Sequence, residues 1–179
     1  MNIEIIAGSP RTGSTSLRVA LHLEQALKAQ TAHRIGLINM QESGLPPIQM
    51  PWSAADKAPE EYRAVAGRMF AADAIILVSP EYNGGYSPAM KNFLDHFPKQ
   101  ARKPFGLVTS SYGGFGGMRA AQQLLQLVPA LFGIASPSLL IVPAVDKKFD
   151  ESGKLLDEAF EKSVQDFITE FLWLAEKIV

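Results

Sequence analysis

The sequence predicts an α/β protein built on a doubly wound, five-stranded parallel sheet with helices on both faces. Short apolar runs of strand length alternate along the chain with longer stretches in which apolar residues recur at helical spacing. The run from Ala74 to Ser79 is almost entirely apolar, as expected of a strand that is covered on both faces. With 179 residues, 47% of them hydrophobic, the chain can form one such domain over residues 1–179.

The elements of the first half follow from periodicity and turn residues. Ile3 to Ala7 reads as the first strand, and Ser14 to Gln30 as a helix, because apolar and polar positions alternate at helical spacing. His33 to Asn39 is a second, shorter strand. The stretch from Met40 to Lys57 contains three prolines and a glycine and is predicted to be a surface loop. Its Trp52 is either a lid or a packed anchor.

The second half repeats the alternation. Pro59 begins a helix that leads into the strand Ala74 to Ser79, which we expect at the centre of the sheet. The next elements are a short helix from Pro88 to Phe97, a strand from Pro104 to Ser110, a long helix from Gly117 to Phe132 that Gly133 ends, and a strand from Ser138 to Val142. Apolar residues then recur every three or four positions from Leu156 to Ile178 and predict a closing helix.

Composition and charge argue against several partners and chemistries. Seventeen basic and 18 acidic residues give a net charge of −1, which provides no long-range attraction for nucleic acid or an anionic membrane. The absence of cysteine excludes disulfides, a thiolate nucleophile and a cysteine-built zinc site. His22, His33 and His96 lack metal-ligand spacing, so no metal site is expected. The strand-like N-terminus and the lack of a long apolar run lead us to expect a cytoplasmic protein.

The loop after the first strand is dense in hydroxyl groups and runs directly into a helix. Ligands of doubly wound sheets bind beyond the carboxyl ends of the strands. Free N–H groups and the helix dipole favour an anion there, and Ser9, Thr15 and Ser16 can add hydrogen bonds while Arg11 adds charge. A simple helix cap would need only one serine. Ser14 stands where a nucleoside triphosphate loop requires lysine, which favours a monophosphate.

Two more loops at the same edge are rich in glycine. After the third strand, Asn83 and Gly84 permit a tight turn with positive φ, against which a flat heteroaromatic group could lie. After the fourth strand, Ser110 opens a loop in which Gly113 and Gly114 permit close approach of a ligand. From these turns alone, an ordinary glycine-rich turn or a flexible loop remains an equally good interpretation.

Three motifs occur in order along the chain. They are Gly8-Ser9-x-Arg11-x-x-Ser14, then Pro80-Glu81-Tyr82-Asn83 with Lys91-Asn92, then Gly116-Gly117-x-Arg119-Ala120 before Gln123-Leu124. Together they resemble the NADPH-dependent FMN reductase family, the flavodoxin-like flavin, quinone, azo-dye and chromate reductases, over roughly the first three quarters of the chain. The resemblance implies a flavodoxin-like fold, FMN as the cofactor and NADPH or NADH as the reductant.

The same resemblance implies the site residues. The first loop would bind the FMN phosphate, Pro80 to Gly84 would face the isoalloxazine, and Ser110 with Gly113 and Gly114 would lie near its other edge. The implied cofactor-binding residues are Ser9, Arg11, Ser14, Thr15, Ser16, Pro80, Glu81, Tyr82, Asn83, Gly84, Ser110, Gly113 and Gly114. No catalytic side chain is predicted, because the flavin carries the chemistry and the protein orients it.

We therefore expect an FMN-dependent NAD(P)H oxidoreductase that transfers hydride to FMN and then passes electrons to a quinone, an azo compound, a metal oxyanion or free flavin. Two alternatives stay open. One is a flavodoxin-like electron carrier that binds no nicotinamide, and the other is a flavin-binding module without turnover. Carriers of this kind tend to be strongly acidic, and a net charge of −1 does not fit that pattern.

The short helix after the third strand suggests self-association. Phe93, Leu94 and Phe97 project from it, and Tyr86 and Met90 precede them, which is more apolar surface than so short a helix needs to dock on its own sheet. The resembled family commonly forms dimers, which pair in some members. We therefore expect a homodimer or homotetramer, with ordinary core packing of these side chains as the competing interpretation.

Overall fold

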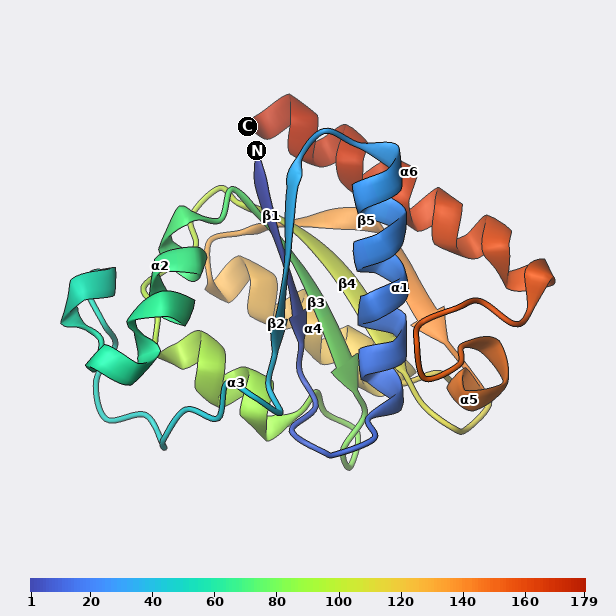
Figure 1. Ribbon diagram of the computed structural model, residues 1–179, viewed down its shortest axis with the longest axis horizontal. Helices are drawn as coiled ribbons and strands as arrows, with labels where there is room; N and C mark the ends of the chain where they lie inside the picture. The colour runs from blue at the N-terminus through green and yellow to red at the C-terminus, as the bar shows by residue number, and fades with distance from the viewer.

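The computed structural model describes residues 1–179 and contains the predicted five-stranded sheet (Figure 1). The strands are β1 (Asn2–Ala7), β2 (Arg34–Asn39), β3 (Ala74–Pro80), β4 (Pro104–Ser110) and β5 (Ile134–Val142). Their order is β2-β1-β3-β4-β5, and every neighbouring pair is parallel. The apolar strand β3 is central, as its composition predicted, and the predicted fold class is confirmed.

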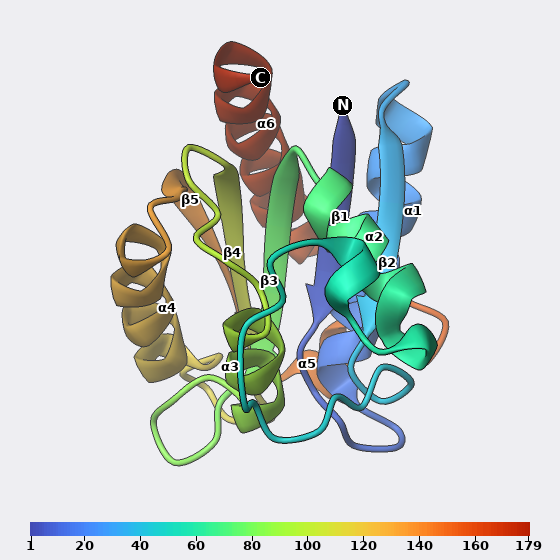
Figure 2. The same cartoon turned by 90° about the vertical axis from the view of Figure 1, so that its left-hand side faces the viewer.

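Two layers of helices cover the sheet. The helices are α1 (Thr15–Gln30), α2 (Arg63–Ala71), α3 (Pro88–Asp95), α4 (Met118–Ala130), α5 (Val145–Lys148) and α6 (Glu161–Ile178). Helices α1 and α6 pack on one face, and α2, α3 and α4 pack on the other (Figures 1 and 2). Each face has its own cluster of buried apolar side chains, centred on Phe167 and Phe171 on the first face and on Phe93 and Phe105 on the second. None of the helices is long and apolar enough to span a bilayer.

The loops after β1 and β3 are tied together at the carboxyl edge of the sheet. This edge lies opposite the end of the molecule that carries both termini (Figure 1). The backbone N–H of Gly8 donates to the carbonyl of Val78 at 2.8 Å, and the hydroxyl of Ser87 donates to the carbonyl of Gly8. The hydroxyl of Ser79 accepts the N–H of Ser87 at 3.0 Å. These bonds hold two loops of the candidate site in a fixed relation.

Strand β5 begins at Ile134, earlier than the predicted start at Ser138. Pro137 lies within the observed strand, although proline has no N–H to donate to a sheet ladder. β5 lies at the edge of the sheet, and its register with β4 shifts between Phe105 and Leu107. This irregularity gives Pro137 a place outside the regular ladder.

The end of α4 also differs from the prediction. The helix ends at Ala130, and the left-handed residue that follows is Phe132, with φ of 61°, whereas Gly133 was expected to end the helix. Gly133 is needed for a different reason. A Cβ atom at this position would lie 2.5 Å from the ring of Phe105.

The closing helix is shorter than its apolar periodicity predicts. Helix α6 begins at Glu161, and Leu156 lies in the preceding loop with 52% of its surface exposed. Asp157 caps a 3₁₀ turn before the helix, because its carboxylate accepts the N–H of Ala159 at 3.2 Å. Helix α5 was not predicted, since four residues are too few to show a period.

The apolar side chains of α3 belong to the interior of the chain. Met90 and Phe93 are fully buried, and Leu94 and Phe97 are 2% and 5% exposed. The inference that this helix leaves spare apolar surface for self-association was therefore wrong, and core packing was the correct alternative. Trp52 packs over the end of the same helix, with its ring centroid 5.5 Å from that of Phe97, and thus acts as an anchor.

Candidate functional site

A cavity of about 580 Å³ opens at the carboxyl edge of the sheet, among the loops after β1, β3 and β4. Its lining residues come from three segments far apart in sequence: Ser9, Arg11, Thr12, Gly13, Ser14, Thr15, Pro80, Glu81, Tyr82, Asn83, Pro88, Ser110, Ser111 and Tyr112. A volume of this size is typical of a small-molecule or cofactor site. The position agrees with the rule that places ligands beyond the carboxyl ends of parallel strands.

The loop after β1 presents the N-terminus of α1 to this cavity. Ser14 is the N-cap, and its hydroxyl accepts the N–H of Leu17 at 3.4 Å and lies 2.9 Å from the hydroxyl of Ser16. The backbone N–H groups of Gly13, Thr15 and Ser16 make no hydrogen bond within the chain. The first turn of α1 contains no acidic residue. Unused donors, the helix dipole and the absence of a repelling carboxylate together favour an anion.

The loop after β3 forms a type I′ turn. The N–H of Tyr82 donates to the carbonyl of Gly85 at 2.8 Å, and the N–H of Gly85 donates back to Tyr82 at 3.0 Å. Asn83 and Gly84 both have positive φ, 51° and 83°, as this turn requires. The turn is therefore a defined structure held by two hydrogen bonds. Burial raises the pKa of Tyr86, which follows the turn, so its phenol stays neutral.

Polar side chains link the first two loops across the cavity. The hydroxyls of Ser9 and Tyr82 lie 3.4 Å apart, and the guanidinium of Arg11 lies 4.6 Å from the centre of the Tyr82 ring. Glu81 turns toward helix α4, where its carboxylate accepts the N–H of Arg119 at 3.2 Å and lies 3.8 Å from the Arg119 guanidinium. Glu81 thereby caps a helix whose own N-cap, Gly117, has no side chain to do so.

The loop after β4 contributes a buried hydroxyl without a partner. Ser110 ends β4 opposite Pro80, is 1% exposed, and its Oγ makes no hydrogen bond within the chain. Its neighbour Ser111 is fixed, because its N–H donates to Val142 at 3.1 Å and its hydroxyl donates to Gly113 at 3.1 Å. A buried polar atom that lines a cavity and lacks a partner is satisfied when a ligand supplies one.

The structure brings nine of the predicted residues to the cavity wall: Ser9, Arg11, Ser14, Thr15, Pro80, Glu81, Tyr82, Asn83 and Ser110. The other four do not line it. Ser16 is 1% exposed beneath the first loop, Gly84 lies at the tip of the turn near Arg119, and Gly113 and Gly114 are exposed farther along their loop.

Sequence reasoning missed five lining residues: Thr12, Gly13, Pro88, Ser111 and Tyr112. The hydroxyl density of the first loop was a signal that could have included Thr12, and Gly13 belongs to the same turn. Ser111 and Tyr112 directly follow Ser110, so a wider window on that loop would have found them. Pro88 carries no such signal, because its place depends on how the chain returns from the β3 turn into α3.

The strand order and the cavity at the carboxyl edge of the sheet are those of the flavodoxin-like α/β proteins. The profile of one family within this class, the NADPH-dependent FMN reductases, matches residues 1–146. The chain belongs to the NADPH-dependent FMN reductase family. This confirms the family resemblance and with it the prediction of an enzyme that uses FMN and NAD(P)H.

Relatives of known function carry matching names. An FMN-dependent NADPH-azoreductase from Staphylococcus saprophyticus is 28% identical over 176 residues, which cover 94% of this chain and 92% of the relative. An FMN-dependent NADPH-azoreductase from Staphylococcus aureus is likewise 28% identical, with the same coverage. The match therefore spans nearly the whole length of both proteins.

Solved structures share the fold at lower identity. A flavoenzyme NAD(P)H:(acceptor) oxidoreductase from Paracoccus denitrificans superimposes with a TM-score of 0.79 at 21% identity, over 99% of this chain and 98% of the other. An FMN-dependent NADH-azoreductase from Bacillus anthracis, solved in complex with FMN, gives a TM-score of 0.59 at 16% identity, over 98% of this chain and 100% of the other. These likenesses establish the flavodoxin-like architecture.

Proposed function

We propose that this chain is an FMN-dependent NAD(P)H oxidoreductase that reduces a small organic acceptor, such as an azo compound or a quinone. The observation that carries the proposal is the convergence of three features on one cavity. These are the unused N–H groups at the start of α1, the type I′ turn after β3 and the unpaired hydroxyl of Ser110. The names of the staphylococcal relatives support NADPH as the reductant and an azo compound as an acceptor.

The residues present fit FMN. A phosphate fits at the N-terminus of α1, where Ser9, Ser14 and Thr15 supply hydroxyls and Arg11 supplies a positive charge. The N–H groups of Asn83 and Gly84 make no hydrogen bond within the chain, so they are free to stabilise negative charge on a ring system beside the turn. In this assignment the unpaired hydroxyl of Ser110 would donate a hydrogen bond to the ring system from the loop after β4.

FMN, when bound, supplies hydride acceptance and electron storage, so the protein itself needs no nucleophile or general base. The chain's own contribution is to bind the phosphate, orient the ring system and exclude water from one of its faces. The carboxylate of Glu81 is engaged by α4 and Arg119, which leaves it poorly placed for proton transfer.

The visible spectrum of the purified protein tests the proposal. We expect a flavin spectrum, an extracted chromophore with the mass of FMN, bleaching by NADPH without oxygen, and recovery of the spectrum on addition of an azo dye or a quinone. FAD as the chromophore, or no flavin at all, would contradict the assignment. A flavin that NADPH does not reduce would instead favour the electron carrier or the flavin-binding module.

Turnover should survive the loss of either ionisable side chain beside the turn. We expect Glu81→Gln and Tyr82→Phe to retain kcat within about ten-fold of the parent at saturating FMN, because no protein base is required. Steady-state NADPH oxidation measures this, with flavin content and melting temperature as checks on folding. A loss of about three orders of magnitude in kcat would mean that the side chain takes part in the chemistry. That result would contradict a mechanism without a protein base.

The unpaired hydroxyl allows a prediction with a matched control. Ser110→Ala should weaken FMN binding by about 2- to 12-fold, the range of one neutral hydrogen bond, and leave the stability of the flavin-free protein unchanged or slightly raised. Ser136, on β5, is 2% exposed and also has an unpaired Oγ, but it does not line the cavity. Ser136→Ala should therefore match Ser110→Ala in stability and leave FMN affinity unchanged. Equal FMN affinity in both variants would remove Ser110 from the site.

Three narrower expectations stay predictions: a single FMN-binding domain over residues 1–179, a homodimer or homotetramer, and a cytoplasmic location. The apolar side chains of α3 are buried within the chain, so they are not available to an interface between subunits. Tyr112 and Phe115, on the loop after β4, are apolar residues that stay exposed, at 68% and 83%. Light scattering across a dilution series measures the oligomeric state directly. A monomer at micromolar concentration would contradict the oligomer.

A further inference from the structure

Tyr112, on the loop after β4, is an aromatic residue of the candidate flavin cavity that has no partner within the chain. Tyr112 and Tyr82 are the two aromatic residues among the 14 that line the cavity. The ring of Tyr82 faces the guanidinium of Arg11 at 4.6 Å, and its hydroxyl lies 3.4 Å from that of Ser9. Tyr112 has no such contact and is 68% exposed. Its ring is therefore free to pack against a ligand.

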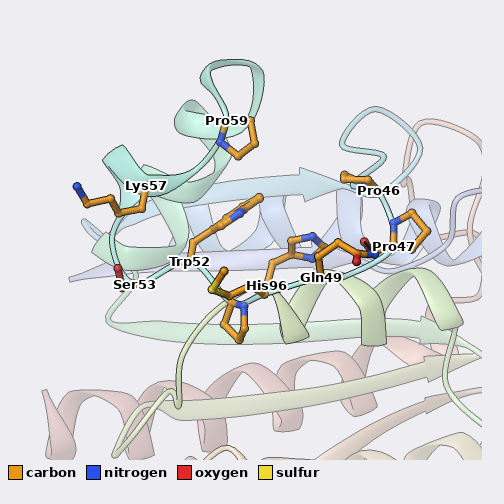
Figure 3. Close-up of a pocket in the computed structure, with 10 residues that line it drawn as sticks. Pro46, Pro47, Gln49, Trp52, Ser53, Lys57, Pro59 and His96 are labelled. Atoms are coloured by element: carbon orange, nitrogen blue, oxygen red, sulfur yellow. Dashed lines mark hydrogen bonds between the residues drawn. The ribbon is translucent and has the colours of Figure 1, made fainter.

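Trp52, the large aromatic residue of the loop between β2 and α2, shows the contrast. Figure 3 shows its ring beside that of His96, with the two centroids 4.7 Å apart, and the ring of Phe97 lies 5.5 Å away. The N–H of Trp52 also donates to the carbonyl of His96 at 2.8 Å. These contacts fasten the loop to the end of α3, so a structural role explains Trp52. No contact of this kind explains Tyr112.

The backbone on both sides of Tyr112 is held in place. The N–H of Ser111 donates to the carbonyl of Val142 at 3.1 Å. The carbonyl of Gly113 accepts the hydroxyl of Ser111 at 3.1 Å and the N–H of Ala144 at 3.3 Å. Tyr112 therefore has an exposed side chain on a backbone that is fixed at both neighbouring residues. A ring presented in this way loses little conformational freedom when it contacts a ligand.

The loop that carries Tyr112 has no charged residue of its own. Residues 110–117 are serine, tyrosine, glycine and phenylalanine only. The charged residues that line the cavity, Arg11 and Glu81, belong to the other two loops. A neutral aromatic ring suits the wall at Tyr112. An inorganic anion, or a phosphate group of NADPH, finds no cation on this loop to attract it.

We propose that Tyr112 selects electron acceptors that contain a planar ring, because its own ring packs against theirs. The inference rests on the proposed function, in which the acceptor enters a cavity that already holds FMN. Tyr112 both lines the cavity and is exposed to solvent, so it lies at the mouth, where an entering acceptor meets it. Azo compounds, quinones and free flavin gain this contact. Metal oxyanions have no ring and do not.

Two acceptors test whether the ring matters. Menadione is a neutral fused-ring quinone that takes two electrons from the reduced enzyme and two protons from solvent, and ferricyanide is a ringless anion that takes one electron. In the holoenzyme, Tyr112→Ser should lower kcat/KM for menadione by about ten-fold, which is the scale of one lost aromatic contact. It should leave kcat/KM for ferricyanide and for NADPH unchanged. Tyr112→Phe keeps the ring and should retain the parent value for menadione.

Phe115 provides the matched control. It is 83% exposed on the same loop but does not line the cavity. Phe115→Ser removes an exposed ring of similar size and should leave kcat/KM for menadione unchanged. Binding is also measured without turnover, by titrating the oxidised holoenzyme with menadione and following the flavin absorbance. Tyr112→Ser should weaken this binding by about ten-fold, and Phe115→Ser should not change it.

Three outcomes would overturn the proposal. One is an equal loss with menadione and with ferricyanide in Tyr112→Ser, because the side chain would then not distinguish a ring. Another is the same affinity for menadione in Tyr112→Ser and Phe115→Ser. The third is weaker FMN binding, or a lower kcat/KM for NADPH, with menadione unaffected, because Tyr112 would then contact the cofactor or the reductant. Failure of the proposed function is seen separately, in a parent protein that holds no flavin or whose flavin NADPH does not reduce.

Discussion

Replacement of Ser14 by aspartate should abolish flavin retention and leave the flavin-free protein at least as stable as its parent. Aspartate is as good an N-cap as serine, and its charge interacts favourably with the positive end of α1. The same charge repels a phosphate. Two like charges about 4 Å apart cost about 1 to 4 kcal/mol at effective dielectric constants between 80 and 20, and the lost hydrogen bond to the phosphate adds about 1.5 to 3 kcal/mol. FMN affinity should fall by about 100-fold or more.

The control lies at the other end of the same helix. Thr31 is the C-cap of α1, where its hydroxyl donates to the carbonyl of Leu27 at 2.9 Å. Thr31→Asp places a negative charge at the negative end of the dipole, so it should lower stability by about 1 kcal/mol and leave FMN affinity unchanged. Fluorescence titration with FMN and thermal melts measure the two quantities. If Ser14→Asp retains FMN, the phosphate does not bind at α1.

The five parallel strands, the central place of β3 and the three loops of the candidate site could be predicted from the sequence, because each rests on local patterns. Apolar runs define the strands, and parallel strands bring their carboxyl ends to one edge. The hydroxyls of the first loop and the Asn83-Gly84 pair are signals within a few residues of sequence. These features needed no knowledge of what each element packs against.

The features that the sequence did not predict depend on contacts between distant segments. Asn92 anchors a loop 44 to 47 residues away, and that loop and the sheet cover the apolar face of α3, which looked unpartnered in the sequence. Glu81 caps a helix that begins 37 residues later. The early start of β5 at Ile134 was missed, because the irregularity that accommodates Pro137 depends on the register with β4. No local pattern carries this information.

One ion pair should have a larger effect on stability than any other charged pair in the protein. Glu4 lies on β1 and is 7% exposed. Its carboxylate accepts hydrogen bonds from Nε of Arg68 at 3.1 Å and from Nη2 at 2.5 Å. Gly36 faces Glu4 on β2, and a Cβ at Gly36 would lie 2.5 Å from Oε2 of Glu4. The strand therefore uses a glycine to leave room for the pair.

Arg68→Met should lower the free energy of unfolding by about 2 to 4 kcal/mol, because it leaves a buried carboxylate without its cation. Loss of one partner of a fully buried pair costs about 3 to 5 kcal/mol, and the side chain of Arg68 is 40% exposed, which reduces the cost. The double variant Glu4→Leu with Arg68→Met should recover most of the loss, since an apolar pair removes the unpaired charge. Urea denaturation measures the free energy of unfolding of the parent, the single variant and the double variant.

The exposed pair Lys91 and Asp95 on α3 is the control for this comparison, and Lys91→Met should cost no more than about 0.5 kcal/mol. Gly36→Ala offers an independent route to the same conclusion. The added methyl group collides with the Glu4 carboxylate, so Gly36→Ala should strongly lower the free energy of unfolding of the parent. In a Glu4→Ala background the same substitution should lower it much less. If Arg68→Met costs less than about 1 kcal/mol, the carboxylate is adequately solvated without arginine, and the open position at Gly36 has another cause.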